Sequence, residues 1–177
     1  MNRLTRNIIT ELTNDIRARG SESSPKPLII KGERNFSAGA DLNEIHTLSG
    51  PEAYAFSALG QALMDAIASY PAPIFAAIEG HCMGGGLDVA LACQRRIAAP
   101  SATFGHRGAA LGLITGWGGT QRLPRLIGKG RALELLVAAE KATALRALQI
   151  GLVDAIANDP AAEAIRLIED LRNTASV

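Results

Sequence analysis

Two short loops in the sequence combine small residues in a way that suits them to hold a negatively charged oxygen. The first is residues 36–41 (FSAGAD), and the second is residues 80–86 (GHCMGGG), which follows the apolar run 73–79. Glycine has no Cβ, so its backbone N–H can approach a ligand closely. The helix that we expect over residues 86–93 would add its positive N-terminal end. This combination predicts chemistry at a carbonyl, with a developing oxyanion held by backbone amides.

The motifs of several other chemistries are absent from the sequence. The glycines of the second loop do not have the G-x-G-x-x-G spacing of a dinucleotide fold, and Gly128-Lys129 lacks the other residues of a phosphate-binding loop. Neither the G-x-S-x-G motif of serine hydrolases nor the H-E-x-x-H motif of zinc proteases occurs. Nucleotide-binding, serine-hydrolase and metal-dependent functions therefore lack their usual signatures, and we expect no metal.

The composition limits the partners and the compartment. The chain has 177 residues, enough for one compact domain, and a formal net charge of +1 without a basic run. Nucleic acid and acidic membrane surfaces are therefore not expected partners. Cys82 and Cys93 are the only cysteines, which we interpret as reduced thiols of a cytoplasmic protein. No signal peptide and no apolar run of membrane-spanning length is recognisable.

The hydrophobic pattern alternates between strands and helices, which indicates an α/β fold with a largely parallel sheet and outer helices. Apolar residues at four-residue spacing predict a first helix over residues 2–19. The further helices that we expect span 51–69, 86–93, 120–127, 131–139 and 144–149, with a last one from Pro160 onward. The expected strands are 27–32, 74–78, 96–99, 103–104 and 152–155.

Four motifs in order resemble the enoyl-CoA hydratase/isomerase (crotonase) family. They are residues 36–42, residues 73–80 with 84–86, Phe104-Gly105, and residues 118–123, and the resemblance extends over 4–157. It implies a crotonase-like spiral of β-β-α units, an acyl-CoA thioester substrate and an enolate intermediate. It also implies a role in fatty acid metabolism, no cofactor apart from the coenzyme A of the substrate, and a homotrimer or dimer of trimers.

Compared with that family, the chain is expected to be shortened at both ends. We divide it into a crotonase-like core of residues 1–157 and a C-terminal helix of residues 158–177. The helix takes the place of a longer helical region that covers the acyl end of the substrate in the family.

The resemblance also assigns the catalytic groups. Two backbone N–H groups of the family hold the thioester oxygen, and they fall on Ala40 and Gly85. Hydratases of the family also use two glutamates, and the first of these positions is Asp88. Asp88 lies three residues after Gly85, on the same helix face, and a carboxylate there can transfer protons although it is one methylene shorter. Alternatively, Asp88 only complements the helix dipole.

The second glutamate position is Gly108, which carries neither an acid nor a base. His106 lies two residues away, and histidine is the residue type best suited to acid–base chemistry near neutral pH, so it is a candidate acid or base; a structural role is the alternative. The missing carboxylate leaves several functions open: a hydratase-like lyase or isomerase, a non-catalytic CoA-thioester binder, and an enzyme similar to naphthoate synthases that uses an external base. A thioesterase with Cys82 as nucleophile is a further reading.

The substrate-binding residues are assigned in the same way. The family's contacts with coenzyme A imply a role for Ala38, Gly39, Asp41, Leu42 and Gly84. Lys31 flanks the first loop and either meets a phosphate or is simply solvated. Trp117, the only tryptophan, lines the acyl pocket or packs in the core.

Overall fold

The structure is a computed structural model that describes residues 2–174. Its helices are α1 (Arg6–Gly20), α2 (Leu42–Ile45), α3 (Gly50–Ala68), α4 (Gly85–Ala92), α5 (Gly119–Ile127), α6 (Lys129–Val137), α7 (Ala144–Gln149) and α8 (Pro160–Thr174), with a 3-10 helix, η1 (Arg107–Leu111). Its strands are β1 (Arg3–Leu4), β2 (Leu28–Lys31), β3 (Gly39–Ala40), β4 (Ile74–Ile78), β5 (His81–Met83), β6 (Arg95–Ala98), β7 (Thr103–Gly105), β8 (Ala142–Thr143) and β9 (Ala155–Ile156).

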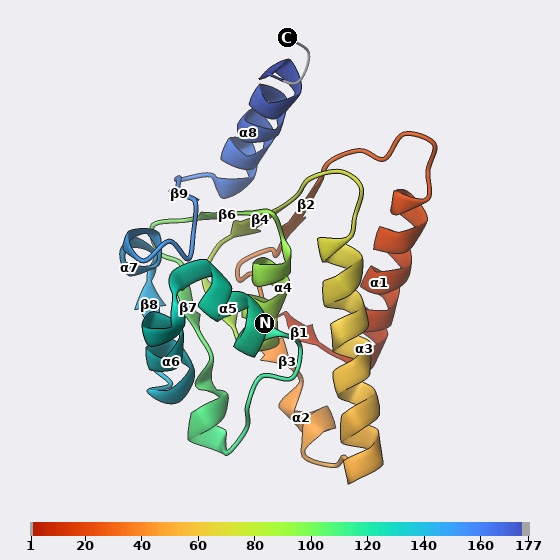
Figure 1. The fold of residues 1–177 in the computed structure, drawn as a ribbon, viewed down its shortest axis with the longest axis vertical. Helices are drawn as coiled ribbons and strands as arrows, with labels where there is room; N and C mark the ends of the chain where they lie inside the picture. Colours follow the sequence, from red (N-terminus) through yellow and green to blue (C-terminus); the bar gives the residue numbers. More distant parts are fainter. Residues whose placement is uncertain (1, 175–177) are drawn as a thin grey trace.

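Three small sheets form the centre of the fold, and helices lie outside them (Figure 1). The largest sheet has the order β2-β4-β6-β9, and all its strands are parallel. All five residues of β4 are buried, as expected for a strand of a parallel sheet that is covered on both faces. A second sheet, β5-β7-β8, contains one antiparallel pair, and β1 pairs with β3. The predicted α/β class with mostly parallel strands is confirmed.

The N-terminus differs from the sequence prediction. The first helix begins at Arg6 rather than at Asn2, because Thr5 is its N-cap and accepts a hydrogen bond from the N–H of Ile8. The residues before it form β1, which pairs in parallel with Gly39–Ala40 of the first glycine loop. The prediction of helix for residues 2–5 is therefore wrong, since a tertiary pairing competes with the local apolar spacing for these residues.

Helix α8 packs on the four-stranded sheet and forms a small apolar cluster separate from the main core. Buried Phe75, Ile97 and Ala164 make its centre, and Leu167 and Ile168 pack against it. Beyond these contacts, α8 extends away from the rest of the molecule (Figure 1). This helix corresponds to the predicted C-terminal segment 158–177, of which residues 175–177 lie outside the described residues. The domain boundary after residue 157 stays a prediction. No helix within residues 2–174 is long and apolar enough to cross a membrane.

The side chain of Trp117 packs between helices α3 and α4. Its indole is 4% exposed, and its ring centroid lies 5.5 Å from that of Phe56 on α3. A Cβ on either Gly60 of α3 or Gly85 of α4 would overlap the indole. These two glycines therefore leave the space that the indole occupies, and the indole contacts both α3 and α4.

We predict that Gly60→Ala destabilises the fold, because the added methyl group would overlap the indole of Trp117. Overpacking of this kind costs about 1–3 kcal/mol. Urea unfolding measures the loss, and because the chain has one tryptophan its fluorescence reports on the same site.

Gly130→Ala is the matched control, because a Cβ at this helical position meets no atom within 4 Å. It should leave the fluorescence unchanged and stabilise the chain by up to about 1 kcal/mol through helix propensity. Equal stability of the Gly60→Ala variant and the wild type would contradict the packing described for Trp117.

Candidate active site

The two glycine loops, far apart in the sequence, lie against each other in the structure. Ser37 donates its N–H to the carbonyl of His81 at 2.9 Å, and Met83 donates its N–H to the carbonyl of Ser37 at 3.0 Å. Gly39 has a φ of 90°, and a Cβ there would lie 2.7 Å from the Met83 carbonyl oxygen and 3.0 Å from the Gly85 nitrogen. Only glycine permits this contact, because the φ is left-handed and the backbones touch.

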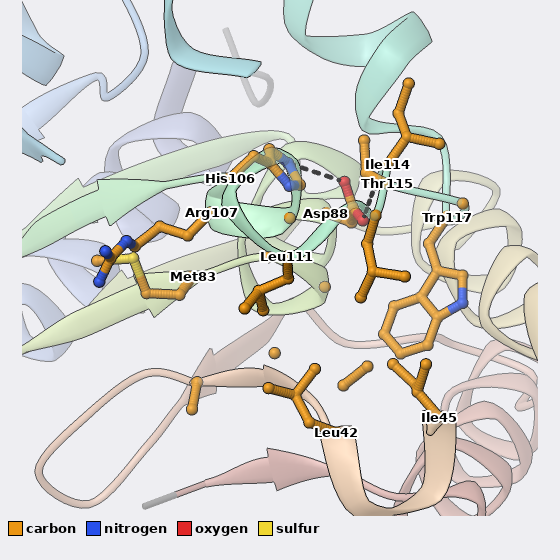
Figure 2. A pocket seen from close by; sticks show the side chains of 18 of the residues that line it. Leu42, Ile45, Met83, Asp88, His106, Arg107, Leu111, Ile114, Thr115 and Trp117 are labelled. Carbon is orange, nitrogen blue, oxygen red and sulfur yellow. Dashed lines mark hydrogen bonds and ion pairs between the residues drawn. The ribbon is translucent and has the colours of Figure 1, made fainter. Parts of the chain in front are cut away.

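A cavity of about 500 Å³ opens beside these loops. It is lined by most of the residues that the sequence analysis assigned to the site, namely Ala38, Gly39, Ala40, Leu42, Gly84, Gly85, Asp88, His106 and Trp117. Figure 2 shows Asp88 and His106 on one wall and Leu42 and Ile45 on the opposite wall. The structure thus brings together residues from four separate parts of the chain.

The backbone at the start of α4 is arranged as an anion-binding site requires. Gly84 is the N-cap, with φ 52° and ψ −123°, and Gly85 is the first helical residue. The first N–H groups of a helix have no partner within the helix, and they carry its positive end. Ala40 follows Gly39 in β3 and lines the same cavity. Ala40 and Gly85, whose amides the resemblance assigned to the thioester oxygen, therefore both line the cavity.

Asp88 is the buried acidic group of the cavity. Its side chain is 2% exposed, its Oδ2 accepts a hydrogen bond of 2.5 Å from the hydroxyl of Thr115, and its Oδ1 lies 3.3 Å from Nε2 of His106 (Figure 2). Oδ1 and Nε2 are both buried and, among the residues that the structure describes, neither has a hydrogen-bond partner. A buried polar atom without a partner costs free energy. The two atoms face each other at 3.3 Å, and each has unused hydrogen-bonding capacity.

The turn of residues 116–119 fixes this cluster from the other side. A Cβ at Gly119 would overlap Oδ1 of Asp88 and would lie 2.9 Å from Nε2 of His106. It would also lie 2.8 Å from Cγ2 of Thr115. The glycine is thus needed for the three side chains to meet, and the turn has a specific packing role.

The position of the missing second glutamate has little room for any side chain. Gly108 lies in η1, and it accepts a hydrogen bond of 2.8 Å from the N–H of Leu113. A Cβ there would lie 2.8 Å from the carbonyl oxygen of Leu113. The backbone of residues 108–113 would have to shift before a carboxylate could occupy this position.

Two predicted substrate-binding residues do not line the cavity. Lys31 is exposed at the end of β2. Asp41 caps α2 by accepting a hydrogen bond of 2.8 Å from the N–H of Asn43, and it lies 3.5 Å from the guanidinium of Arg3. These contacts give Asp41 a structural role that the sequence analysis did not foresee.

Conversely, Thr115, Arg107 and Lys141 line the cavity but were not assigned to the site from the sequence. Thr115 is 27 residues from Asp88, and no motif spacing connects the two. Lys141 directly precedes β8, and it reaches the cavity because β8 pairs with β7. The sequence did not predict this pairing. Arg107 could have been found from its position beside His106.

The cavity has an apolar end and a cationic end. Phe56, Trp117 and Ile45 line the first. Arg107 and Met83 lie at the other end, with Asp88 and His106 between (Figure 2). The apolar end suits an acyl chain, because its walls are aliphatic and aromatic. Within residues 2–174, no group of three or more His, Cys, Asp or Glu side chains is placed to hold a metal ion.

Comparisons with known proteins agree with this fold. The family model described as enoyl-CoA hydratase/isomerase matches residues 1–176. The chain therefore belongs to the enoyl-CoA hydratase/isomerase family, and the resemblance seen in the sequence is confirmed. It is 44% identical over 162 residues to a probable enoyl-CoA hydratase of Bacillus subtilis (strain 168), covering 90% of this chain and 63% of that protein. It is 40% identical over 158 residues to a crotonyl-CoA hydratase of Syntrophomonas wolfei, covering 88% and 61%.

Solved structures give the same result for the fold. An enoyl-CoA hydratase from Bacillus anthracis superposes with a TM-score of 0.90 and 36% identity, over 96% of this chain and 67% of that one. DspI of Pseudomonas aeruginosa gives a TM-score of 0.92 and 32% identity, over 97% and 72%. The crotonase fold is therefore confirmed. The chain spans less than two thirds of the length of the curated relatives named above.

The two cysteines contribute no side chain to the lining of the cavity. Cys82 and Cys93 are buried, and neither lines the cavity. Burial raises the pKa of the Cys82 thiol well above its ordinary value, and it raises the pKa of Cys93 to about 12. A thiol must be deprotonated to act as a nucleophile. The reading of Cys82 as a thioesterase nucleophile therefore has no support in the structure.

We predict that neither thiol of the folded chain reacts with a thiol reagent such as Ellman's reagent at pH 8, and that both react after unfolding in urea. The raised pKa values also have a consequence for stability. The folded chain retains protons that the unfolded chain releases above about pH 8.5. The contribution of the two buried thiols to stability should therefore be constant below this pH and should decrease as the pH rises toward 12.

Urea midpoints measured between pH 7 and pH 10.5 test the second part. The Cys93→Ala variant should lose less stability over this range than the wild type, because one of the two titrating groups is gone. Rapid labelling of the folded wild type at pH 8 would contradict the burial of the thiols.

Proposed function

We propose that the chain acts on acyl-CoA thioesters as a lyase or isomerase, most closely as an enoyl-CoA hydratase, through an enolate whose oxygen is held by two amides. The observation that carries the proposal is the buried Asp88 carboxylate. It faces the cavity within one helical turn of Gly85 and contacts His106. An acid–base pair beside an oxyanion site is what removal or addition of a proton next to a carbonyl requires.

In this mechanism the N–H groups of Ala40 and Gly85 donate to the thioester oxygen. As negative charge develops on that oxygen, the amides stabilise it without reorganisation, because the surrounding backbone already fixes them. The loss of one such donor typically costs about 3–4 kcal/mol of transition-state stabilisation. Support comes from the contact of Gly39 with Gly85 and from the start of α4 at the cavity wall.

Asp88 and His106 are proposed to move the protons. In hydration, a base takes one proton from a water molecule as the water oxygen forms a bond to C3, and the electrons of the C2–C3 double bond move toward the thioester oxygen. The protonated base or a second acid then delivers a proton to C2 of the enolate. In isomerisation, the base removes a proton from one carbon, and the same proton or another is returned at a different carbon. The hydrogen bond from Thr115 to Oδ2 leaves Oδ1 of Asp88 for the substrate and for His106. His106 would thereby assume part of the role of the missing second carboxylate.

Gly108 keeps a second candidate function open, because it leaves the usual water-binding pair of glutamates incomplete. In that alternative the chain is a CoA-thioester binder without chemistry, or an enzyme similar to naphthoate synthases that recruits an external base. The tight contact of Gly108 with Leu113 favours this alternative over a standard two-glutamate hydratase.

The names of the relatives support an enoyl thioester of coenzyme A as substrate. That the reaction uses no separate cofactor stays a prediction. We also propose a role in fatty acid metabolism, which the resemblance to the family implies. A homotrimer or dimer of trimers would cover apolar surface such as Ile114, which is 79% exposed at the cavity. The cytoplasmic location remains a prediction that rests on the two unpaired cysteines.

The test is mass spectrometry of short enoyl-CoA and 3-hydroxyacyl-CoA thioesters incubated with the protein in D₂O. The wild type should place deuterium at C2, and a mass gain of one water would separate hydration from isomerisation. The Asp88→Asn variant should exchange at least about 100-fold more slowly, because it keeps the shape but loses the base.

Asp65→Asn is the matched control, since this carboxylate is 77% exposed on α3 and contacts only Arg122 among the described residues. It should exchange at the wild-type rate. Exchange by the Asp88→Asn variant at the same rate would remove Asp88 from the mechanism. Binding of thioesters by the wild type without any exchange would favour the non-catalytic alternative.

A further inference from the structure

The hydroxyl of Thr115 makes the two oxygens of the Asp88 carboxylate unequal. Oγ1 of Thr115 lies 2.5 Å from Oδ2 of Asp88, as expected for a hydroxyl that donates to an ionised carboxylate. Oδ1 has no hydrogen-bond partner among the residues that the structure describes, and it faces Nε2 of His106 at 3.3 Å. One oxygen is therefore held, and the other keeps its capacity to accept a proton.

The methyl group of Thr115 limits the directions that its hydroxyl can take. A Cβ at Gly119 would lie 2.8 Å from this methyl carbon, Cγ2, so the methyl group packs against the glycine. Threonine carries two heavy atoms on Cβ, and few side-chain rotamers are open to it. With the methyl group on Gly119, the hydroxyl points toward Asp88, as Figure 2 shows.

The backbone that follows Thr115 is held on α3. The carbonyl oxygen of Gly116 accepts hydrogen bonds from Oγ of Ser57 at 3.1 Å and from Nε2 of Gln61 at 2.8 Å. A Cβ at Gly116 would lie 2.9 Å from Oγ of Ser57, so the glycine permits this close approach. The next residue, Trp117, is buried against α3 and α4. Thr115 thus precedes two anchored residues, and its own backbone has little freedom to move.

The place of a single carboxylate oxygen matters for proton transfer. The terminal torsion of an aspartate side chain has a broad energy minimum, so a carboxylate that nothing holds turns easily. A base must lie within hydrogen-bond distance of the proton, and a misplacement of about 1 Å can lower a rate about 100-fold. A donor to the ionised carboxylate also stabilises the charged form that the base needs. A hydroxyl on Oδ2 therefore affects the reaction through Asp88 without touching the reacting atoms.

We propose that Thr115 is a positioning residue: its hydroxyl holds Oδ2 of Asp88, so that Oδ1 alone exchanges protons with the substrate. Oδ1 removes the proton at C2, and the electron pair of the C–H bond moves toward the thioester oxygen. The reverse step returns a proton from Oδ1 to C2. The inference rests on the proposed function, because it takes Asp88 to be the base, and it adds which oxygen acts and which side chain selects it.

The test measures the exchange of deuterium into C2 of 3-hydroxybutyryl-CoA in D₂O and, separately, the binding of butyryl-CoA by calorimetry. Thr115→Val keeps the shape of the side chain and removes the hydroxyl. Exchange should slow about 10- to 100-fold, as the loss of one hydrogen bond to a charged group predicts. Binding should not change, because the shape of the cavity wall is kept. Thr115→Ser keeps the hydroxyl and should retain most of the exchange rate.

A double variant separates positioning from a general disturbance of the fold. Asp88→Asn removes the group through which Thr115 acts, so Thr115→Val should have little further effect in that background. A purely structural effect of the valine would instead slow exchange by the same factor in both backgrounds. Urea unfolding checks that each variant is folded, and Thr115→Ala, which also lacks the hydroxyl, replaces the valine variant if that one does not fold.

Thr120→Val on α5 is the matched control. Among the described residues, its hydroxyl contacts only the side chain of Gln121, and it does not line the cavity. This variant should exchange deuterium and bind butyryl-CoA as the wild type does.

Exchange by Thr115→Val at the wild-type rate would overturn the positioning role, as would equal slowing in the two backgrounds or an equal loss in Thr115→Ser. Failure of the proposed function has a different sign, namely a wild type that binds butyryl-CoA but places no deuterium at C2 of 3-hydroxybutyryl-CoA. That result would overturn both, whereas exchange by the wild type together with an unaffected Thr115→Val variant would overturn the positioning role alone.

Discussion

Two backbone segments can touch only where no side chain lies between them. In this chain Gly39 allows the first glycine loop to touch the backbone of Met83 and Gly85. A Cβ at Gly39 would lie 2.7 Å from the carbonyl oxygen of Met83, and the left-handed φ of 90° excludes most other residues. The hydrogen bonds of Ser37 with His81 and Met83 hold the segments in register. The opening of α4 at the cavity wall beside Ala40 depends on this contact.

Other glycines extend the same constraint to the side chains of the site. Gly60 and Gly85 leave room for Trp117, which closes the apolar end of the cavity. Gly119 leaves room for the side chains of Asp88 and His106 to contact each other. A stable acid–base pair in a buried position thus depends on residues that have no side chains of their own. The stability of the site and its chemistry are therefore coupled, since a methyl group at any of these positions disturbs both.

The sequence predicted the parts of the site that depend on local pattern. The two glycine loops and the helix after the second loop follow from spacing along the chain, and the resemblance to the family assigned Asp88 in the first turn of that helix. It did not predict Thr115 or Lys141, because their places result from packing and strand pairing across 27 residues or more. It placed helix on residues 2–5, of which Arg3–Leu4 form β1 by pairing with the first loop. Local patterns contain no information about such partners.

The most direct test of the central claim is the infrared frequency of a thioester carbonyl bound to the protein, measured with butyryl-CoA labelled with ¹³C at the carbonyl. Amides that donate to the carbonyl oxygen weaken its double bond, so the account predicts a shift to lower frequency than in water. The shift should persist in the Asp88→Asn variant, because the donors are the backbone amides of Ala40 and Gly85. A bound carbonyl that absorbs at the frequency found in water would contradict the account.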